Sequence, residues 1–445
     1  MSNSSAGAVR LSVRAQARAA RVAARKLALL SNDARNAVLQ NVSKRTKQNA
    51  ARILAANAED CKAAEKLVRS GKLSEAAFAR LNVSEKTIRE MVLRLEEVAR
   101  LDDPIGIRLA TTELDEGLIL YKESCPLGVV AVVFESRPDV VPQVAALAFK
   151  SGNAVLLKGG AEATRTNEAL VELWREALCE KSDVPAAAVT LLQSRADVME
   201  LLQLKREVDL IVPRGSREFV EYIFANSKVP VLGHGEGICH VYVDRAGDLG
   251  KAHAIVLDAK TQYPAACNSV ETLLVHKDVA AQFLPEVAAN LSAAGVELRG
   301  CERTRAILRG ANIKPAKDVD WATEYSDLIL SIRVVDSLDG ALDHIAEYGS
   351  LHTESIVTED AATAERFLAE VDAAGVYHNV STRFADGYRY GLGSEVGISN
   401  SKLHARGPMG MEGLTTYKYK LIGNGHIVGT YARGERTLRP RNLKS

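Results

Sequence analysis

The stretch PLGVVAVVFESRPDVVPQVAALAFKSGNAVLLKGG, residues 126–160, contains the repeating unit on which the fold depends. LGVVAVVF (127–134) and NAVLLK (153–158) are short apolar runs rich in valine and leucine, which is typical of buried strands. PDVVPQVAALAFKSG (138–152), between them, has the apolar spacing of a helix and ends at a glycine. A strand, a helix and a second strand in this order predict parallel pairing of the two strands.

The alternation of apolar runs and helical patterns continues to about residue 380, which predicts an α/β fold. Buried strands joined by helices form parallel sheets that are covered on both faces. Residues 9–100 differ, because Ala, Leu, Arg, Lys and Glu dominate there and proline is absent, which predicts helices. Further strands are expected at 187–193, 208–213, 229–233, 240–244, 270–275, 328–335, 353–357 and 375–380.

The composition limits the classes of function. The chain has 445 residues, which at roughly 150 residues per domain predicts two or three domains. Lys and Arg total 57 and Asp and Glu total 56, so the near-zero net charge argues against a general binder of nucleic acids or acidic membranes. The longest uncharged apolar run, CPLGVVAVVF, is too short to span a bilayer.

The six cysteines are widely spaced and form neither a CxxC pair nor a metal-ligand pattern, so no metal site is expected. In a chain of this size they indicate reduced thiols and a cytoplasmic protein. The first 30 residues are rich in Arg, Ser and Ala and lack acids, as organelle transit peptides are. The alternative, which we prefer, is a surface helix with an apolar face formed by Leu11, Ala15, Ala19 and Val22.

Cys267 is the first candidate for a functional residue. It stands in KTQYPAACNSVETLLV, just before the strand-like VETLLV and among small residues that leave room for a substrate to approach. A nucleophilic thiolate needs this access, and a helix end or backbone N–H groups can favour the thiolate form. The alternative is an ordinary packed cysteine.

Two strand ends carry residues suited to a phosphate or a ribose. Lys158 ends a strand in LLKGGAEATRTN, and ligands of open parallel sheets bind beyond such strand ends. Gly215 and Ser216, in VPRGSREF, open a helix after another strand, and a helix N-terminus is a good anion site. Neither motif is a GxGxxG or a P-loop. The alternatives are a surface lysine and a plain N-cap by Ser216.

Two further groups carry positive charge. Ser136 and Arg137, in VVFESRPDVVP, lie between a strand and a helix, where they could hold an oxyanion or a phosphate. The alternative is a cap residue beside a surface arginine. Lys402, His404 and Arg406, in SKLHARGPMGMEGLTTYKY, precede a glycine-rich turn and form either a solvated basic loop or a pocket for an anionic substrate.

The order of these motifs closely resembles the γ-glutamyl phosphate reductases (glutamate-5-semialdehyde dehydrogenases) of proline biosynthesis, a branch of the aldehyde dehydrogenase superfamily. FESRPDVVPQ, LLKGGAEATRTN, VPRGSREFV, GHGEGICHVYVD, the loop before Cys267 and KLHARGPMGMEGLTTYKY carry the resemblance, which runs from about residue 12 to 432. It implies an aldehyde-dehydrogenase-like fold of two doubly wound parallel-sheet domains with a small β flap for oligomerisation. It also implies NADPH-dependent reduction of L-glutamyl 5-phosphate to L-glutamate 5-semialdehyde and phosphate.

The resemblance implies roles for individual residues. Cys267 falls where the superfamily carries its nucleophile, which would form a thioester with the substrate. Lys158 falls on the lysine that holds the adenosine ribose. Gly215 and Ser216 fall on the turn that contacts the pyrophosphate, and Glu324, in TEYSDLIL, falls where a glutamate holds the nicotinamide ribose.

The resemblance also implies a use for the basic residues. Arg137 and the group of Lys402, His404 and Arg406 would supply positive charge for the acyl phosphate and the α-carboxylate of the substrate. Arg383 and Asp386, in TRFADG, are expected to help shape the pocket for the amino-acid part of the substrate.

Three departures from the superfamily pattern affect the expected chemistry. Gly233 falls where hydrolytic members carry a general-base Glu, so phosphate rather than water is expected as acceptor, although Glu236 leaves a shifted base open. Ser136 replaces the Asn that helps to hold the oxyanion, which leaves the backbone N–H of Cys267 as one donor. Ala161 lies where NAD-preferring relatives carry a carboxylate, so a preference for NADPH over NADH is expected.

Two other functions stay open. The first is a hydrolytic aldehyde dehydrogenase that acts on glutamate 5-semialdehyde. The second is a catalytically silent binding protein that keeps the fold, which the joint presence of Cys267, Lys158 and the Gly-Ser turn argues against. The length leaves no room for a fused kinase, so glutamate 5-kinase is expected as a separate, transient partner.

Three parts of the chain are expected. Residues 1–254 form a nucleotide-binding domain, with 115–140 partly in the flap, and residues 255–408 form a catalytic domain with Cys267. In residues 409–445, Asn424-Gly425 lies between two strand-like runs, which predicts a C-terminal β-hairpin. Such a hairpin can pair with a sheet edge of another subunit, so a homodimer or homotetramer is expected. Neither a nucleic acid nor a membrane is expected as a partner.

Overall fold

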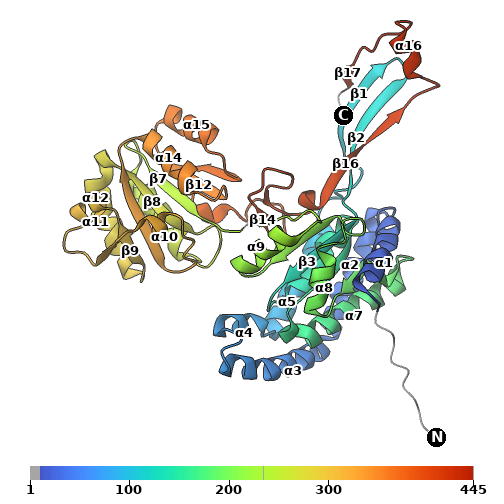
Figure 1. Ribbon diagram of the computed structural model, residues 1–445, viewed down its shortest axis with the longest axis horizontal. Helices are drawn as coiled ribbons and strands as arrows, with labels where there is room; N and C mark the ends of the chain where they lie inside the picture. The colour runs from blue at the N-terminus through green and yellow to red at the C-terminus, as the bar shows by residue number, and fades with distance from the viewer. Residues whose placement is uncertain (1–10, 234, 444–445) are drawn as a thin grey trace. The chain divides into compact units, whose positions relative to one another are not determined.

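The computed structural model describes residues 11–233 and 235–443 (Figure 1). The chain divides into two compact units. The first contains the chain up to Leu232, residues 392–397 and the chain from Met409, and the second contains Gly233–Gly391 and Ile398–Pro408. This division differs from the predicted boundary at residue 254 and from the predicted separate C-terminal segment. The second unit begins earlier in the chain than predicted, because the strand that follows Gly233 pairs with the strand that follows Cys267.

Helices fill the described part of the N-terminal region, as predicted. The first helix, α1, packs small residues against the neighbouring sheet, among them Ala17, Ala20 and Ala24. The predicted surface helix is present, but Leu11 precedes it at 61% exposed and Val22 is 53% exposed, so other residues form its packed face. Alanines on the buried face let the helix approach the sheet closely. The helices are α1 Val13–Leu27, α2 Asn32–Gln48, α3 Ala50–Arg69, α4 Glu75–Leu81 and α5 Glu85–Arg100.

A parallel sheet with the strand order β5-β4-β3-β6 forms the core of the first unit. β3 and β4 are buried along their whole length, as their apolar runs predict, and in β4 the burial extends to the terminal Lys158. The strand expected at 229–233 is wrong: Val231 makes only an isolated bridge to Ile211, because Pro230 has no N–H to extend the pairing. The elements are β3 Val129–Phe134, α6 Val140–Lys150, β4 Ala154–Lys158, α7 Thr164–Lys181, β5 Val189–Leu191, α8 Arg195–Leu201, β6 Leu210–Arg214 and α9 Arg217–Asn226.

An antiparallel sheet with the order β16-β2-β1-β17 forms the flap (Figure 1). The predicted hairpin is wrong, because the turn at Gly425, with a φ of 74°, leads into helix α16 and not into a strand. β16 pairs instead with β2 over its whole length, from Thr415 opposite Pro126 to Ile422 opposite Ile119. The elements are β1 Arg108–Asp115, β2 Leu118–Pro126, β16 Thr415–Ile422, α16 Val428–Ala432 and β17 Arg441–Leu443.

A parallel sheet with the order β10-β9-β11-β8-β7-β12-β13 forms the second unit. One face is covered by α10 and α11 and the other by α14 and α15, so the predicted α/β architecture is confirmed. The turn with Cys267 leads into β8, near the middle of this sheet. The strands are β7 Cys239–Val243, β8 Val270–His276, β9 Glu297–Gly300, β10 Ile313–Pro315, β11 Ile329–Val335, β12 Thr353–Val357 and β13 Gly375–His378.

The remaining elements connect these sheets. The α-helices of the second unit are α10 Leu249–Thr261, α11 Lys277–Ala293, α12 Glu302–Ile307, α13 Asp318–Trp321, α14 Leu338–Tyr348 and α15 Ala361–Glu370. The shortest elements are β14 Ile398–Ser399, β15 Gly407–Pro408, and the 3₁₀ helices η1 Ala161–Ala163, η2 Ala186–Ala188, η3 Thr382–Phe384 and η4 Glu412–Leu414.

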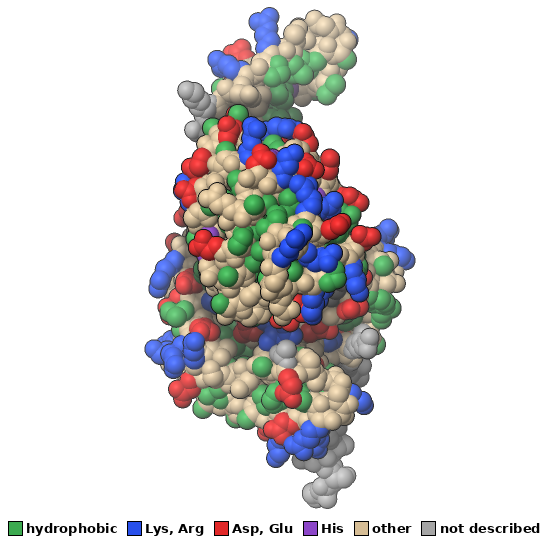
Figure 2. Space-filling model, turned by 90° about the vertical axis from the view of Figure 1, so that its left-hand side faces the viewer, with side chains coloured by type: hydrophobic (Ala, Val, Ile, Leu, Met, Phe, Trp, Pro, Cys, Tyr) green, Lys and Arg blue, Asp and Glu red, His purple; other side chains and the backbone are tan. Residues whose placement is uncertain are grey.

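The surface agrees with the balanced composition. Acidic and basic side chains are interspersed over the face drawn in Figure 2. Among the helices of residues 11–233 and 235–443, none combines the length and the apolar character needed to cross a bilayer. All six cysteines are free thiols.

Candidate active site

Cys267 lies in a tight turn between α10 and β8, and its side chain is partly exposed. Backbone hydrogen bonds hold the turn: Ala266 N–H donates to Tyr263 O (3.2 Å) and Ser269 N–H donates to Ala266 O (2.8 Å). β8 begins only at Val270 and is buried throughout. The thiol therefore stands at the entrance of a central strand, outside the apolar run, with the access that the sequence predicts.

A buried ion pair closes the loop that carries Cys267. Lys260, in the last turn of α10, donates from Nζ to Glu271 Oε2 (2.7 Å) and to Val270 O (3.0 Å). The two side chains are 0% and 1% exposed. Burial raises the pKa of Glu271 to about 7, although Lys260 opposes this shift, and burial lowers the pKa of Lys260. The pair joins both ends of the loop, and sequence analysis missed it because Lys and Glu normally lie on the surface.

The segment just before β7 packs against the backbone of Cys267. A Cβ placed on Gly237 would lie 1.9 Å from the carbonyl oxygen of Cys267, so only glycine fits there. Cys239 Sγ donates to the same oxygen at 3.4 Å. Gly237 N–H donates to Glu324 Oε2 at 2.9 Å. Glu324, expected at the nicotinamide ribose, is therefore tied to the backbone beside Cys267.

The Gly237→Ala substitution is expected to displace the Cys267 turn, because the new methyl group would overlap a backbone oxygen that cannot rotate away. We expect kcat to fall by about 10- to 100-fold, the usual effect of misplacing a reacting group by about an ångström. Steady-state kinetics and the urea midpoint measure the effect. The control is Gly235→Ala, whose Cβ would meet nothing within 4 Å. Equal activity in the two variants would contradict the prediction.

Lys158 ends β4 and is 7% exposed. Its Nζ donates to Gly159 O. Burial lowers the pKa of Lys158, while Glu162 and Asp197 oppose this shift. A Cβ on Gly159 would lie 2.2 Å from Asn167 Nδ2, so the chain passes close to α7 at this point. The lysine thus lies at the carboxyl end of a parallel strand, the edge at which such sheets bind ligands.

A carboxylate lies at the Gly-Ser turn that opens α9. Ser216 caps this helix by accepting a hydrogen bond from Phe219 N–H (3.4 Å), as the N-cap alternative predicts. Ser216 N–H donates to Glu135 Oε2 at 3.1 Å, and a Cβ on Gly215 would lie 2.6 Å from the same oxygen. The N–H groups of this turn can therefore bind an anionic oxygen. A cofactor phosphate that bound there would displace the carboxylate of Glu135 from Ser216 N–H. Sequence analysis did not single out Glu135.

Ser136 is 4% exposed and has a φ of 41°. Its N–H and its Oγ both donate to Glu162 Oε1, at 2.8 and 2.7 Å. The hydroxyl is therefore engaged by a carboxylate, and a part for Ser136 in holding an oxyanion requires Glu162 to release it. Arg137 pairs with Asp139 at 3.1 Å, which is what the surface-arginine alternative predicts.

The basic loop before β15 converges on one carboxylate. Lys402 and Arg406 both form ion pairs with Asp372, the latter at 2.8 Å, and the two hydrogen bonds lower the pKa of Asp372. His404 lies between the two cations in the sequence. The arrangement is one that can hold an anion, but in this structure the protein's own Asp372 supplies the anion.

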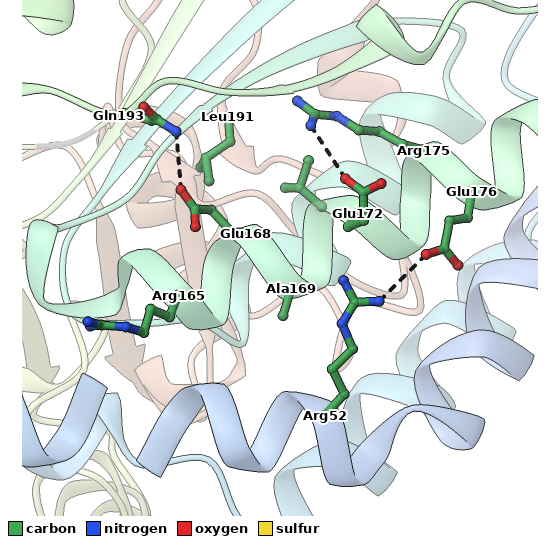
Figure 3. Close-up of a pocket in the computed structure, with 10 residues that line it drawn as sticks. Arg52, Arg165, Glu168, Ala169, Glu172, Arg175, Glu176, Leu191 and Gln193 are labelled. Carbon is green, nitrogen blue, oxygen red and sulfur yellow. Dashed lines mark hydrogen bonds and ion pairs between the residues drawn. The ribbon is translucent and has the colours of Figure 1, made fainter. Parts of the chain in front are cut away.

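A pocket of about 580 Å³ is lined mainly by residues of α3 and α7, and none of the predicted site residues lines it (Figure 3). Three arginines and three glutamates line it. Within the pocket, Arg52 pairs with Glu176 and Arg175 pairs with Glu172, each at 3.5 Å. The charges of its lining balance, so this pocket does not select an anionic or cationic ligand.

Comparisons with known proteins agree with the geometry. The sequence model described as "Aldehyde dehydrogenase family" matches residues 4–307. The chain is 53% identical over 417 residues to "Gamma-glutamyl phosphate reductase" of Synechococcus sp. (strain JA-3-3Ab), covering 94% of this chain and 91% of that protein. A crystal structure of gamma-glutamyl phosphate reductase from Thermotoga maritima is 39% identical, with a TM-score of 0.90, covering 94% of this chain and 100% of that one.

A distant structural neighbour shares the fold alone. It is an engineered glycolyl-CoA reductase with bound NADP⁺, 14% identical, with a TM-score of 0.61, covering 92% of this chain and 96% of the neighbour. The match to the family model covers more than half of the chain, and the cyanobacterial relative is matched over nearly its whole length. The chain belongs to the aldehyde dehydrogenase family, in the group formed by the gamma-glutamyl phosphate reductases.

Proposed function

We propose that this protein reduces L-glutamyl 5-phosphate to L-glutamate 5-semialdehyde and phosphate with NADPH, the second step of proline biosynthesis from glutamate. The observation that carries the proposal is 53% identity to a gamma-glutamyl phosphate reductase over 94% of the chain. The accessible thiol of Cys267, on a loop that is closed by a buried ion pair, supports it. The enzyme is thus an oxidoreductase that acts on an aldehyde in the reverse direction.

Cys267 is the proposed nucleophile. Its thiolate attacks the γ-carbonyl carbon, a C–S bond forms, and the bond to the phosphate oxygen breaks, so that phosphate leaves with the electron pair. The backbone N–H of Cys267 is one donor for the transient oxyanion. The nicotinamide cofactor, when bound, supplies the hydride. Cleavage of the C–S bond then releases the aldehyde and returns the thiolate of Cys267.

Four residues are proposed to hold the cofactor: Lys158, Gly215, Ser216 and Glu324. The chain fits such a group, because Lys158 ends a parallel strand and the N–H of Ser216 already donates to a carboxylate oxygen. The carboxylate of Glu324 accepts a hydrogen bond from Gly237 N–H, which lies against the backbone of Cys267, and this supports its use as an acceptor for a ribose hydroxyl.

The preference between NADPH and NADH is a sharper proposal. Ala161 offers no carboxylate to the ribose hydroxyls, and the next residue, Glu162, has its Oε1 bonded to Ser136. We expect kcat/KM for NADPH to exceed that for NADH by at least about 10-fold, roughly 1.4 kcal/mol. Initial rates over a range of each cofactor measure this ratio. A higher kcat/KM with NADH would overturn the proposal.

The hydrolytic alternative is separated by one experiment. Reduction of NADP⁺ with glutamate 5-semialdehyde is followed with and without phosphate. A rate that depends on phosphate supports the proposed reaction, in which phosphate attacks the thioester. An equal rate without phosphate would support the hydrolytic reaction and make Glu236, which is three residues beyond Gly233, the base to test.

We also propose how the subunits and partners are arranged. β16 has one edge paired with β2, and the structure gives no partner strand for its other edge among the described residues. Tyr419, Leu421 and Ile422 on it are more than half exposed, at 60%, 54% and 58%. Pairing of this edge with another subunit would give a homodimer or homotetramer. The proposed compartment is the cytoplasm, which suits six free thiols, and glutamate 5-kinase is a proposed transient partner.

A further inference from the structure

Arg383 brings a guanidinium to the loop that carries Cys267. It lies on η3 and is 7% exposed. Its Nε donates to Gln262 Oε1 at 2.9 Å, and its guanidinium carbon lies 5.8 Å from the centre of the Tyr263 ring. Gln262 and Tyr263 belong to the loop between α10 and β8 that ends at Cys267. Contacts with two residues of this loop place the guanidinium beside the turn of the nucleophile.

The charge of Arg383 has no direct counter-ion. Within residues 11–233 and 235–443, no carboxylate lies within ion-pair distance of this side chain, whereas Arg137 pairs with Asp139 and Arg406 pairs with Asp372. Burial and the neighbouring Arg389 lower the pKa of Arg383, and the charges of Cys267, Asp386 and Asp258 oppose this shift.

Burying a cation without a partner is unfavourable, so the position is stabilised by whatever anion it receives. Among the basic side chains considered for substrate binding in the second unit, Lys402 and Arg406 are already neutralised by Asp372. Arg383 combines burial, an unpaired charge and contact with the loop of Cys267.

We propose that Arg383 binds the α-carboxylate of the substrate, an assignment that rests on the proposed reduction of L-glutamyl 5-phosphate. The guanidinium has a planar fork that matches a carboxylate with two parallel hydrogen bonds, and Nε is already used on Gln262, which leaves the two Nη groups for the ligand.

The choice of carboxylate over phosphate follows from burial. Phosphate must leave to solvent in every turnover and is strongly hydrated, which suits an exposed site. The carboxylate stays in place through both chemical steps, so an almost fully buried anchor suits it. This anchor would hold the γ-carbonyl at Cys267 while the leaving group departs.

The test uses the reverse reaction of the full-length enzyme with two aldehydes, glutamate 5-semialdehyde and the uncharged pentanal. Arg383→Gln is expected to lower kcat/KM for the semialdehyde by about 100-fold, mostly through KM, because truncating one side of a buried charge pair has effects of this order. The rate with pentanal and the KM for phosphate and NADP⁺ should change less than about 3-fold. Arg366→Gln, an exposed arginine paired with Glu370 in the same unit, is the matched control and should leave all values unchanged.

Arg383→Lys keeps the charge without the fork and should raise the KM for the semialdehyde by about 10-fold. It decides the question if Arg383→Gln fails to fold. A rise in the KM for phosphate with an unchanged KM for the semialdehyde would overturn the assignment and make Arg383 a phosphate ligand. An equal fall in kcat for both aldehydes would also overturn it, because the charge would then act on Cys267. If the wild-type enzyme does not oxidise the semialdehyde, the proposed function is wrong, and the assignment of Arg383, which rests on it, is wrong as well.

Discussion

Cys267→Ala should abolish the phosphate-dependent oxidation of glutamate 5-semialdehyde, with a loss in kcat of at least about 1,000-fold. The loss of a covalent nucleophile has effects of this size, because the remaining groups bind the substrate but cannot form the thioester. Within residues 11–233 and 235–443 the partly exposed thiol makes no hydrogen bond, so the urea midpoint and the KM for the cofactor should stay near the wild-type values.

Two further measurements make this prediction specific. Cys179→Ala removes an exposed thiol in α7 and should leave the rate unchanged. Mass spectrometry of enzyme mixed with L-glutamyl 5-phosphate in the absence of cofactor should detect a glutamyl adduct on Cys267 in the wild type and none in Cys267→Ala. A folded Cys267→Ala variant that retains more than a tenth of the activity would remove the thioester from the mechanism.

Of the single substitutions considered for this protein, Lys260→Met is expected to lower the free energy of unfolding the most. The substitution leaves Glu271, which is 1% exposed, without its partner, and breaking a buried pair in this way typically costs about 3–5 kcal/mol. The double variant Lys260→Met with Glu271→Met removes both charges and should recover most of that loss, since apolar side chains of similar size often replace a buried pair without cost. Urea unfolding of the two variants and the wild type measures the difference.

The pH dependence of the stability loss in Lys260→Met shows whether the lost charge pair or lost packing is responsible. Burial raises the pKa of Glu271 to about 7 in the folded state, whereas the unfolded chain has the ordinary value near 4.5. Between about pH 5 and 7 the folded state therefore holds a proton that the unfolded state has released, and this stabilisation is lost as pH rises through 7. The effect of Lys260→Met should accordingly be smaller at pH 5.5 than at pH 8, and the double variant should lack this pH dependence. The same loss at both pH values would show that packing, not charge, is responsible.

The ion pair also links stability to the active site. Lys260 joins α10 to the first residues of β8, and Cys267 lies on the loop between them. The double variant therefore tests whether a stable protein with a looser loop keeps its kcat. Gly237 and Glu324 lie next to the carbonyl of Cys267, and Ser326 joins them to the ion pair, because it donates to Glu271 Oε1 (3.4 Å) and to Glu324 Oε1 (3.3 Å).

Local sequence was sufficient for most elements of the two parallel sheets. The run at 129–134 is apolar throughout and those at 154–158 and 270–276 are mostly apolar, and such runs are buried when they pair in a parallel sheet. The small residues around Cys267 also predicted its access. These features depend on neighbours in the chain, so they can be predicted without knowing the fold.

Pairing across long distances in sequence was not predictable in the same way. Asn424-Gly425 does form a turn, yet local sequence cannot say that β16 pairs with β2, roughly 300 residues earlier, and not with the segment that follows the turn. For the same reason local sequence cannot say that β7 pairs with β8 and β12 of the second unit, because an apolar run carries no information about its partner.

By itself, the sequence determined the fold class and the family and predicted a nucleophile at Cys267, because periodicity, turn residues and motif order are local properties of the chain. Only the tertiary structure decided which charges are buried and how they are paired. Lys260 and Glu271, or Arg406 and Asp372, are ordinary charged residues in the sequence, and their pairing depends on which elements the fold brings together. Among the described residues, Arg383 is more buried than Arg137 and Arg406 and, unlike them, has no carboxylate within ion-pair distance, which only three-dimensional proximity decides.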